Sequence, residues 1–387
     1  MPTEISDWND LDNVSNDLTG DYVLVNDLDS ETDGYAGIGD DFEPIGRRSF
    51  DANAFGGTFD GDGFNIQNIE INTDGADRGC GLFGGVEGTD PSLMNISVSG
   101  VYSGVFSEDF AGGLVGSFED GIIQNCVSHV DVTSDGEQVG GLVGQNDDTI
   151  TESYATGSVE GDSNVGGLVG QNFETVTDSY ATGSVEGDGQ VGGLVGRNDD
   201  SVTESYATGS VEGDSNVGGL VGFNGDTVTD SYWDTETTGQ STSDGGTGLT
   251  TDEMTGDDAE TNMDGLDFFS EWDLVEADLI FSFDGEITLN ETAAETATVI
   301  LHNLDKPEDI DFIAEDGYPI LSNIDESNQL EDQGVLDTQG NIARTETDSD
   351  GNYEANILAD NGDTIAVAAD FDDGLERYGR LITTVIE

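Results

Sequence analysis

The chain has 387 residues, and its 84 Asp and Glu against 8 Lys and Arg give a formal net charge of -76 at pH 7. This charge excludes nucleic acid as a natural partner and disfavours anionic membranes, because phosphates would be repelled. Apolar residues recur throughout, which disfavours a disordered acidic tail. The composition favours the protein of an extreme halophile, since molar salt shortens the Debye length to about 3 Å and hydrated carboxylates preserve solubility.

The first residues, MPTEISDWNDLDNV, contain neither a basic nor an apolar region, so no secretion signal is visible. Trp8, Leu11 and Val14 are at helical spacing, with Ser6 as the expected N-cap. We therefore predict a short helix that covers one end of the fold. No later stretch approaches the ~20 apolar residues of a membrane span. Cys80 and Cys126 lack zinc-site spacing and are expected to be buried free thiols.

A Gly-Leu-(Val or Phe)-Gly tetrad recurs through the middle of the chain. Its leucines are 32, 28, 26, 26 and 26 residues apart. The tetrads occupy residues 81–84, 113–116, 141–144, 167–170, 193–196 and 219–222. Such a fixed period is typical of a solenoid.

Each period holds three short runs of β character, of the type VGGLVG, TVTDSYA and GSVEG, and no helical spacing. Three strands per period, with the next period stacked about 4.8 Å away in parallel register, predict a β-helix. Identical residues of successive coils should then form columns. We expect interior apolar columns that include Val165, Val191 and Val217, an aromatic column of Tyr154, Tyr180, Tyr206 and Tyr232, and an amide column of Asn146, Asn172, Asn198 and Asn224.

For the tyrosines, stacking in the core is favoured over a sugar-binding strip, and the asparagines are expected to hydrogen-bond to one another in a turn. Acidic residues should stack too, as Glu160, Glu186, Glu212 and as Asp162, Asp188, Asp214. Like charges at this spacing repel by about 1 kcal/mol per pair in water. We predict that the fold needs salt, or Na, K, Mg or Ca ions along the Asp162, Asp188 and Asp214 ladder. Alternation leaves Glu152 and its equivalents either on a strand or in a turn.

The tetrad in this setting resembles the GLUG motif of bacterial and archaeal surface proteins and adhesins. FGGTFDGDGFNIQNIEI (55–71) and DYVLVNDLD (21–29) are similar to the opening of such domains, and SYWDTETTGQSTSDGGTGLTTDEM (231–254) to their close. The resemblance covers roughly residues 1–275. It implies a right-handed β-helix presented outside a cell and no particular chemistry. Thr251 is the expected cap of a closing helix within 245–275.

Residues 276–387 show a different pattern, with the alternating runs EITLN, TATVILHN, ARTETD, NYEANIL, TIAVAADF and RLITTVIE. They predict an antiparallel β-sandwich. TATVILHN and TETDSDGNYEANI resemble the carboxypeptidase regulatory-like, or transthyretin-like, domain. GYPILSNID (317–325) departs from the usual order, because such a phrase closes the repeat domain in GLUG-type chains. The domain boundary is accordingly placed only between 265 and 335.

No catalytic constellation is apparent. His129 and His302 belong to no HExxH motif, there is no GxSxG, and Arg197 is the single basic residue of the four near-identical repeats. We predict no enzyme, with a polysaccharide depolymerase as the minor alternative. Asp348, Asp350 and Asn352 could bind calcium, but Tyr353 replaces the EF-hand glycine, so a tight hairpin turn is favoured.

Two functions follow from a rigid, repetitive, outward-facing chain. The first is a virion protein of a virus of halophilic archaea, a spike, turret or tail fibre that attaches to a host surface glycoprotein or glycan. The second is a secreted haloarchaeal adhesin or surface-layer associated protein. The expected partners are further copies of the chain, as a homotrimer, and other virion or cell-surface proteins.

Overall fold

The computed structural model describes residues 1–46, 53–71, 79–102 and 110–275, and beyond these the strands named below with a few residues between 317 and 333. The chain divides into two compact units. The first comprises 1–254, 258–273 and 321–325, and the second comprises 255–257, 274–320 and 326–387. They are described separately.

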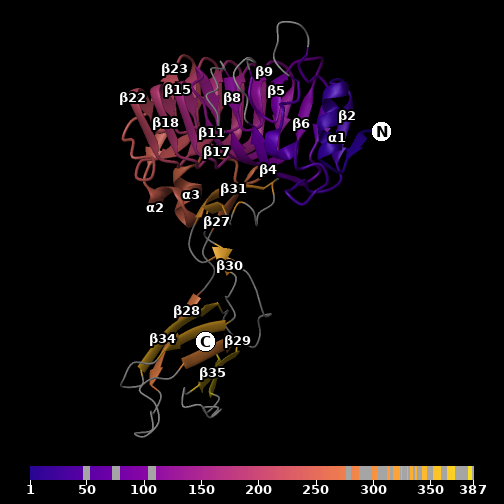
Figure 1. The fold of residues 1–387 in the computed structure, drawn as a ribbon. Coiled ribbons are helices and arrows are strands. Elements are labelled where there is room, and N and C mark those ends of the chain that lie inside the picture. The colour runs from indigo at the N-terminus through magenta and orange to yellow at the C-terminus, as the bar shows by residue number, and fades with distance from the viewer. Residues whose placement is uncertain are drawn as a thin grey trace. The chain divides into compact units, whose positions relative to one another are not determined.

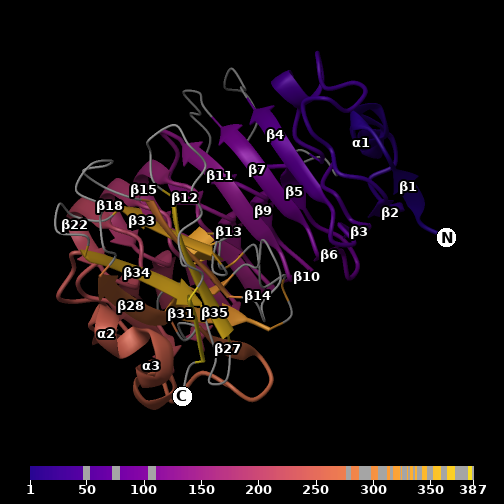
Figure 2. The same cartoon turned by 90° about the horizontal axis from the view of Figure 1, so that it is seen from below.

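The first unit is a β-solenoid whose coils stack in parallel register (Figures 1 and 2). One coil consists of β14 (Thr149–Ala155), β15 (Val159–Gly166) and β16 (Val169–Asn172). Each strand pairs with its counterpart in the next coil, so that Tyr154 faces Tyr180 and Val165 faces Val191. The predicted all-β solenoid of about 26-residue coils is confirmed, whereas its right-handed sense stays a prediction.

Three strand ladders run along the solenoid. The first comprises β1 (Thr3–Ile5), β2 (Asp21–Leu24), β3 (Thr58–Asp60), β6 (Ser92–Met94), β10 (Ile122–Gln124), β14, β17 (Thr175–Ala181), β20 (Ser201–Thr203) with β21 (Tyr206–Ala207), β24 (Thr227–Thr229) with β25 (Tyr232–Asp234), and β26 (Thr247–Leu249). The second comprises β4 (Asn65–Ile71), β7 (Ser97–Tyr102), β11 (Val127–Thr133), β8 (Phe110–Gly112), β12 (Gln138–Gly140), β15, β18 (Val185–Gly192) and β22 (Val211–Gly218). The third comprises β5 (Phe83–Val86), β9 (Val115–Phe118), β13 (Val143–Asn146), β16, β19 (Val195–Asn198) and β23 (Val221–Asn224).

The strand β15 is longer than the sequence suggested. The residues GDSN, expected to separate two runs, continue the strand, and Asn164 bends it with a positive φ of 46°. The turn to β16 lies instead at Gly167 and Leu168. A Cβ on Gly167 would lie 2.1 Å from the carbonyl oxygen of Gly193, so only glycine permits this stacking distance.

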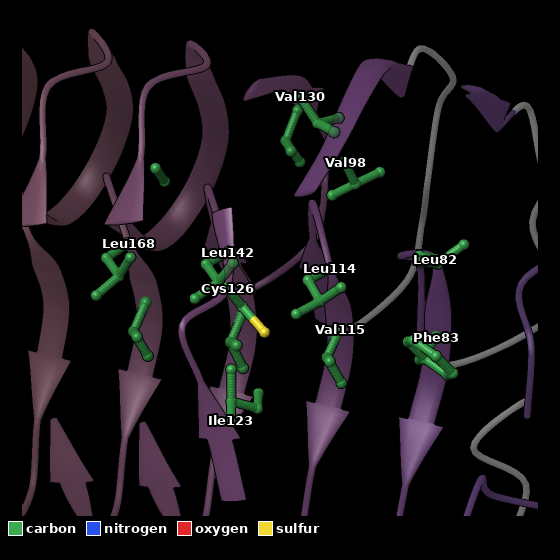
Figure 3. Packing of buried hydrophobic residues seen from close by; sticks show 14 of the residues in the cluster. Leu82, Phe83, Val98, Leu114, Val115, Ile123, Cys126, Val130, Leu142 and Leu168 are labelled. Atoms are coloured by element: carbon green, nitrogen blue, oxygen red, sulfur yellow. The ribbon is translucent and has the colours of Figure 1, made fainter. Parts of the chain in front are cut away.

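The interior is filled by columns of identical apolar side chains. Leu82, Leu114, Leu142 and Leu168 lie in a row from coil to coil (Figure 3) and are fully buried, as are Val165 and Val191. Val217, at the last coil, is only partly buried. Both cysteines are buried free thiols, as predicted, and burial raises the pKa of Cys126 to about 12. Its thiol is therefore protonated and unreactive at neutral pH.

The asparagine column forms the predicted amide ladder. The Nδ2 of Asn146, Asn172 and Asn198 donates to the Oδ1 of the next asparagine at 2.7, 2.8 and 2.8 Å. Each Nδ2 also donates to backbone carbonyl oxygens, for Asn172 those of Glu174 and Ser201. The ladder thus adds a second donor to turn carbonyls such as that of Glu174, which also accepts from the Ser201 amide.

The predicted helix at the first end is α1 (Trp8–Asn13), followed by the 3-10 helix η1 (Val14–Asn16). Trp8, Leu11 and Val14 are fully buried, but the prediction of Ser6 as N-cap was wrong. Asp7 caps the helix by accepting from the Asp10 amide, and Ser6 donates back to the Asp10 carboxylate. The Asp7 and Asp10 side chains thus form an arrangement close to a capping box. It differs in that the Asp10 carboxylate accepts from Ser6, one residue before the N-cap, and not from Asp7 itself. A second 3-10 helix, η2 (Gly39–Asp41), follows later in the chain.

Two short helices, α2 (Thr251–Met254) and α3 (Gly256–Asn262), follow the repeats. Thr251 is not the cap. It is the first residue of α2, and its hydroxyl donates to Asp234 at 2.6 Å. Thr250 precedes the helix instead: its amide and hydroxyl donate to the Glu253 carboxylate, which is one half of a capping box, and its carbonyl oxygen accepts from the Glu253 amide.

The second unit contains antiparallel sheet. Its four-stranded sheet has the order β33 (Ile342–Glu346), β29 (Thr298–Asn303), β35 (Thr364–Asp370), β36 (Ile382–Val385), and β28 (Ile280–Glu286) pairs with β34 (Asn352–Leu358). A further pairing joins β30 (Phe312–Ile313) to β32 (Leu336–Asp337). The strands β27 (Trp272–Val275) and β31 (Gly317–Leu321) also pair, and each of them has residues in both units. Antiparallel strands are confirmed, while the sandwich and its regulatory-like family stay predictions. EITLN lies outside the described residues after Glu286.

We expect Asn172→Ala to lower the free energy of unfolding by about 2 to 3 kcal/mol, because it breaks the amide ladder at both neighbours and leaves buried groups without partners. Asn224→Ala is the matched control. Asn224 ends the ladder and is only partly buried, so its loss should cost about 1 kcal/mol or less. Thermal unfolding followed by circular dichroism in molar KCl measures both, and equal losses would contradict the ladder's role.

Candidate functional site

The outer face of the second ladder carries two rows of exposed carboxylates, called here the outer acidic ladders. Glu160, Glu186 and Glu212 pair directly in register on β15, β18 and β22. Asp162, Asp188 and Asp214 lie two residues further along the same strands, also exposed. Adjacent strands are about 4.8 Å apart, so equal charges face each other along the solenoid.

A second acidic column lies where the strands of the first ladder kink. Glu152, Asp178, Glu204 and Asp230 have positive φ values of 47°, 45°, 47° and 50°. The open question about Glu152 is thus resolved, since it lies within strand β14 at a left-handed kink. We call these four residues the carboxylate column. Asn and Asp adopt this conformation more readily than other L-residues, which accounts for Asp178 and Asp230 but not for Glu152 and Glu204.

Crowding in the carboxylate column favours a proton on Glu204. Partial burial, a hydrogen bond to Asp178 and the charges of Asp178, Asp230 and Asp267 raise the pKa of Glu204 to about 7. Asp178 also accepts a bond from the indole Nε1 of Trp272, at 3.4 Å. Near neutral pH, Glu204 is therefore protonated in a substantial fraction of the molecules, and its proton is then donated to the Asp178 carboxylate.

The tyrosine column is stacked and buried, as predicted. The ring centroids of Tyr154 and Tyr180 are 4.5 Å apart and those of Tyr180 and Tyr206 5.0 Å, with the planes within 5° of parallel. The rings lie outside the interior apolar cluster, and Trp272 covers Tyr180 and Tyr206 at 6.2 and 5.5 Å. Because they are buried, these rings cannot serve as a sugar-binding strip.

A polar edge joins the second and third ladders. Gln138 Nε2 donates to Gln171 Oε1, and Gln171 Nε2 donates to Asp199 Oδ2, at 3.1 and 2.8 Å. Arg197 binds Asp199 through Nε and Nη2 at 2.6 and 2.8 Å, which lowers the pKa of the Asp199 carboxyl group. The guanidinium also lies over the ring of Phe223, 4.9 Å from its centroid. Arg197 is thus committed to a structural ion pair.

The predicted calcium ligands Asp348, Asp350 and Asn352 stay a prediction. Asn352 is the first residue of β34, and Asp348 and Asp350 lie outside the described residues. His129 Nδ1 contacts the Thr156 hydroxyl at 2.8 Å. Across the part of the chain that the structure describes, no three His, Cys, Asp or Glu side chains come together as a metal-ligand cluster. The helices described there include none long and apolar enough to span a bilayer.

These features define a class, a β-solenoid repeat protein with stacked polar and acidic ladders and no assembled catalytic centre in the described residues. The family comparison agrees, because the GLUG motif matches residues 135–160, 161–186 and 187–212. Each matched segment is 26 residues long, which equals the spacing of the tetrads, although the segments do not begin at the tetrads. No solved structure is similar to the chain.

The chain is also similar to the protein named halomucin, from the archaeon Haloquadratum walsbyi strain DSM 16790 / HBSQ001. The two are 38% identical over 159 residues, which is 39% of this chain and 2% of halomucin. The chain therefore spans only a small fraction of its curated relative.

Two parts of this surface were missed from the sequence. The kinks at the carboxylate column have a sequence signal, since Asn95, Asn125, Glu152 and Asp178 occupy equivalent positions, but alternation could not locate the bend. The polar edge had a weaker signal, a Gln or Asn just before the Val-Gly-Gly of several coils. Its contact with the third ladder depends on how the coil closes.

We expect the β spectrum to be lost on dialysis to low salt, because the outer acidic ladders then repel without screening. Replacing Glu160, Glu186 and Glu212 together by Gln should lower the salt concentration at the unfolding midpoint. Replacing the exposed Glu4, Glu31 and Glu43 by Gln removes the same charge away from the ladders and should shift the midpoint less. Circular dichroism during dialysis measures this, and an unchanged wild-type spectrum would refute the idea.

Glu204→Gln should alter the pH dependence of stability. A carboxyl pKa raised from 4.5 to about 7 means that the folded state binds the proton more tightly. The contribution of Glu204 protonation to the free energy of unfolding is complete below about pH 4.5 and is lost as the pH rises through about 7. The variant should match the wild type in acid and exceed it by about 1 kcal/mol above neutrality, after allowance for screening by solvent. Thermal midpoints across this range test it, with Glu31→Gln, an exposed glutamate outside the outer acidic ladders, as the control.

Proposed function

We propose that the chain is an adhesin-like structural part of the extracellular surface of a halophilic archaeon. The similarity to halomucin over 159 residues, the GLUG matches and the acidic composition support this proposal. The observation that carries it is the rigid solenoid with its outer acidic ladders, exposed over successive coils on β15, β18 and β22. A scaffold of this kind presents the same surface group many times.

The ladders suggest how attachment would work. Carboxylates at about 4.8 Å spacing attract cations, and these ions bridge to acidic glycans or glycoproteins on a neighbouring surface. Many weak bridges acting together give avidity without any deep pocket. The expected partners are therefore surface glycans or glycoproteins and further copies of the same chain, including a homotrimer.

A virion attachment role, as a spike, turret or tail fibre, uses the same chemistry in another location. It remains a hypothesis that localisation would decide. Immunogold labelling of a haloarchaeal culture should place the protein on cells or in the shed surface material. Labelling confined to virus particles would replace the cellular proposal with the viral one.

Purified chain should bind whole haloarchaeal cells or their isolated surface glycoprotein in molar salt. Replacing Glu160, Glu186 and Glu212 together by Gln should weaken binding several-fold. The Glu4, Glu31 and Glu43 triple variant should not, since these residues lie outside the outer acidic ladders. Biolayer interferometry measures both. Equal binding by the two variants would refute attachment through the ladders, and release of reducing or unsaturated sugar ends would indicate a depolymerase instead.

A further inference from the structure

Buried polar atoms without a partner are concentrated at the polar edge. Among the described residues, five buried side-chain atoms have no hydrogen-bond partner, and three of them belong to residues at this edge, Gln138, Asn164 and Gln190. The five are Ser117 Oγ, Asn125 Oδ1, Gln138 Oε1, Asn164 Oδ1 and Gln190 Oε1. Buried polar groups are normally satisfied, so such a concentration indicates a ligand that the protein itself does not provide.

Three of these atoms are amide oxygens in one register. Gln138, Asn164 and Gln190 each precede a valine of the directly paired column Val139, Val165 and Val191. They therefore repeat from coil to coil at the strand spacing of about 4.8 Å. We call them the amide row.

The hydrogen-bond network fixes which atom of Gln138 is the oxygen. Asp199 is held as an acceptor by Arg197, so the Gln171 atom that contacts it must be the donor Nε2. Gln171 then presents Oε1 to Gln138, whose Nε2 must be the donor of that bond. The remaining Gln138 atom, buried in the row, is an acceptor.

The surroundings of the amide row are negative. Asp162 and Asp188 precede Asn164 and Gln190 by two residues, and the Glu160 and Glu186 pair lies further along the same strands. Carbonyl oxygens with carboxylates nearby suit hard cations, which take oxygen ligands. The formal charge of -76 supplies a strong attraction for such ions.

We propose that the amide row binds a file of hard cations, Na⁺, K⁺ or Ca²⁺. The amide oxygens of Gln138, Asn164 and Gln190 ligate the ions directly, and Asp162 and Asp188 supply neutralising charge without being the ligands. The salt requirement then has two parts, general screening of the outer acidic ladders and specific occupation of the amide row.

Arg197 provides an internal test. A Cβ on Gly196 would lie 2.5 Å from the backbone carbonyl carbon of Asn164, so Arg197 follows immediately beside the row. The preceding coils have Gln145 and Gln171 at this position. The guanidinium charge opposes a cation at the Asn164 level, and Arg197→Gln should therefore strengthen cation binding several-fold.

The experiment separates ligation from screening by holding ionic strength constant. Tetramethylammonium chloride screens charge, but its cation is too large to enter the amide row. In successive samples it is replaced by NaCl, KCl or CaCl₂ at the same ionic strength, and the midpoint of thermal unfolding is recorded. In the wild type at least one small cation should raise the midpoint above its value in tetramethylammonium. The salt that does so at the lowest concentration identifies the ion.

The Asn164→Gly, Gln190→Gly double variant should lose more than half of this specific rise. Glycine keeps the positive φ that both residues adopt, so the backbone is preserved. Asn216→Gly is the matched control, in the same register with a φ of 51° but exposed, and it should retain the full rise.

The proposal is overturned if tetramethylammonium and the small cations give the same midpoint, which would mean that the oxygens bind only water. It is also overturned if the double variant keeps the wild-type rise, or if Arg197→Gln leaves the cation concentration at half-effect unchanged. The Arg197→Gln variant keeps the amide row intact, so the test remains decisive if the double variant fails to fold.

Discussion

The structure depends on parallel strand pairing between coils of equal length, which places each side chain over its own counterpart. Because of this register, each residue type at a given repeat position forms a column along the solenoid. Where the repeated group is apolar, as at Leu142 and Leu168, the column fills the interior. Where it can both donate and accept, as at Asn172, the column hydrogen-bonds to itself.

The same register makes ionised groups costly. Two stacked glutamates repel and cannot hydrogen-bond to each other when both are ionised. The structure reduces this repulsion in different ways. The exposed Glu160 and Glu186 depend on solvent and salt, whereas partial burial and the hydrogen bond to Asp178 raise the pKa of Glu204. At the polar edge, Arg197 pairs with Asp199. Stacking therefore connects the halophilic composition to the fold, and the surface function proposed above relies on the carboxylates left outside.

Much of the solenoid could be predicted because period and residue type are both local properties of the sequence. The three strands per coil, the tyrosine and asparagine columns and the buried cysteines all followed from the 26-residue spacing. The errors arose at helix ends, where the conformation of a single residue determines which side chain caps the helix. Ser6 and Thr251 were each assigned a capping role that an adjacent residue performs, because capping depends on backbone dihedrals that a propensity does not fix.

The sequence alone determined that the repeats stack, which residues share a column, and that the surface is acidic, since each of these is a consequence of repetition and charge. Only the tertiary structure decided what packs against the columns from outside. Trp272, far along the chain, returns to pack against Tyr180 and Tyr206. The polar edge exists because glycines such as Gly196 let two strand ladders approach closely, a packing distance that no pattern of residues states by itself.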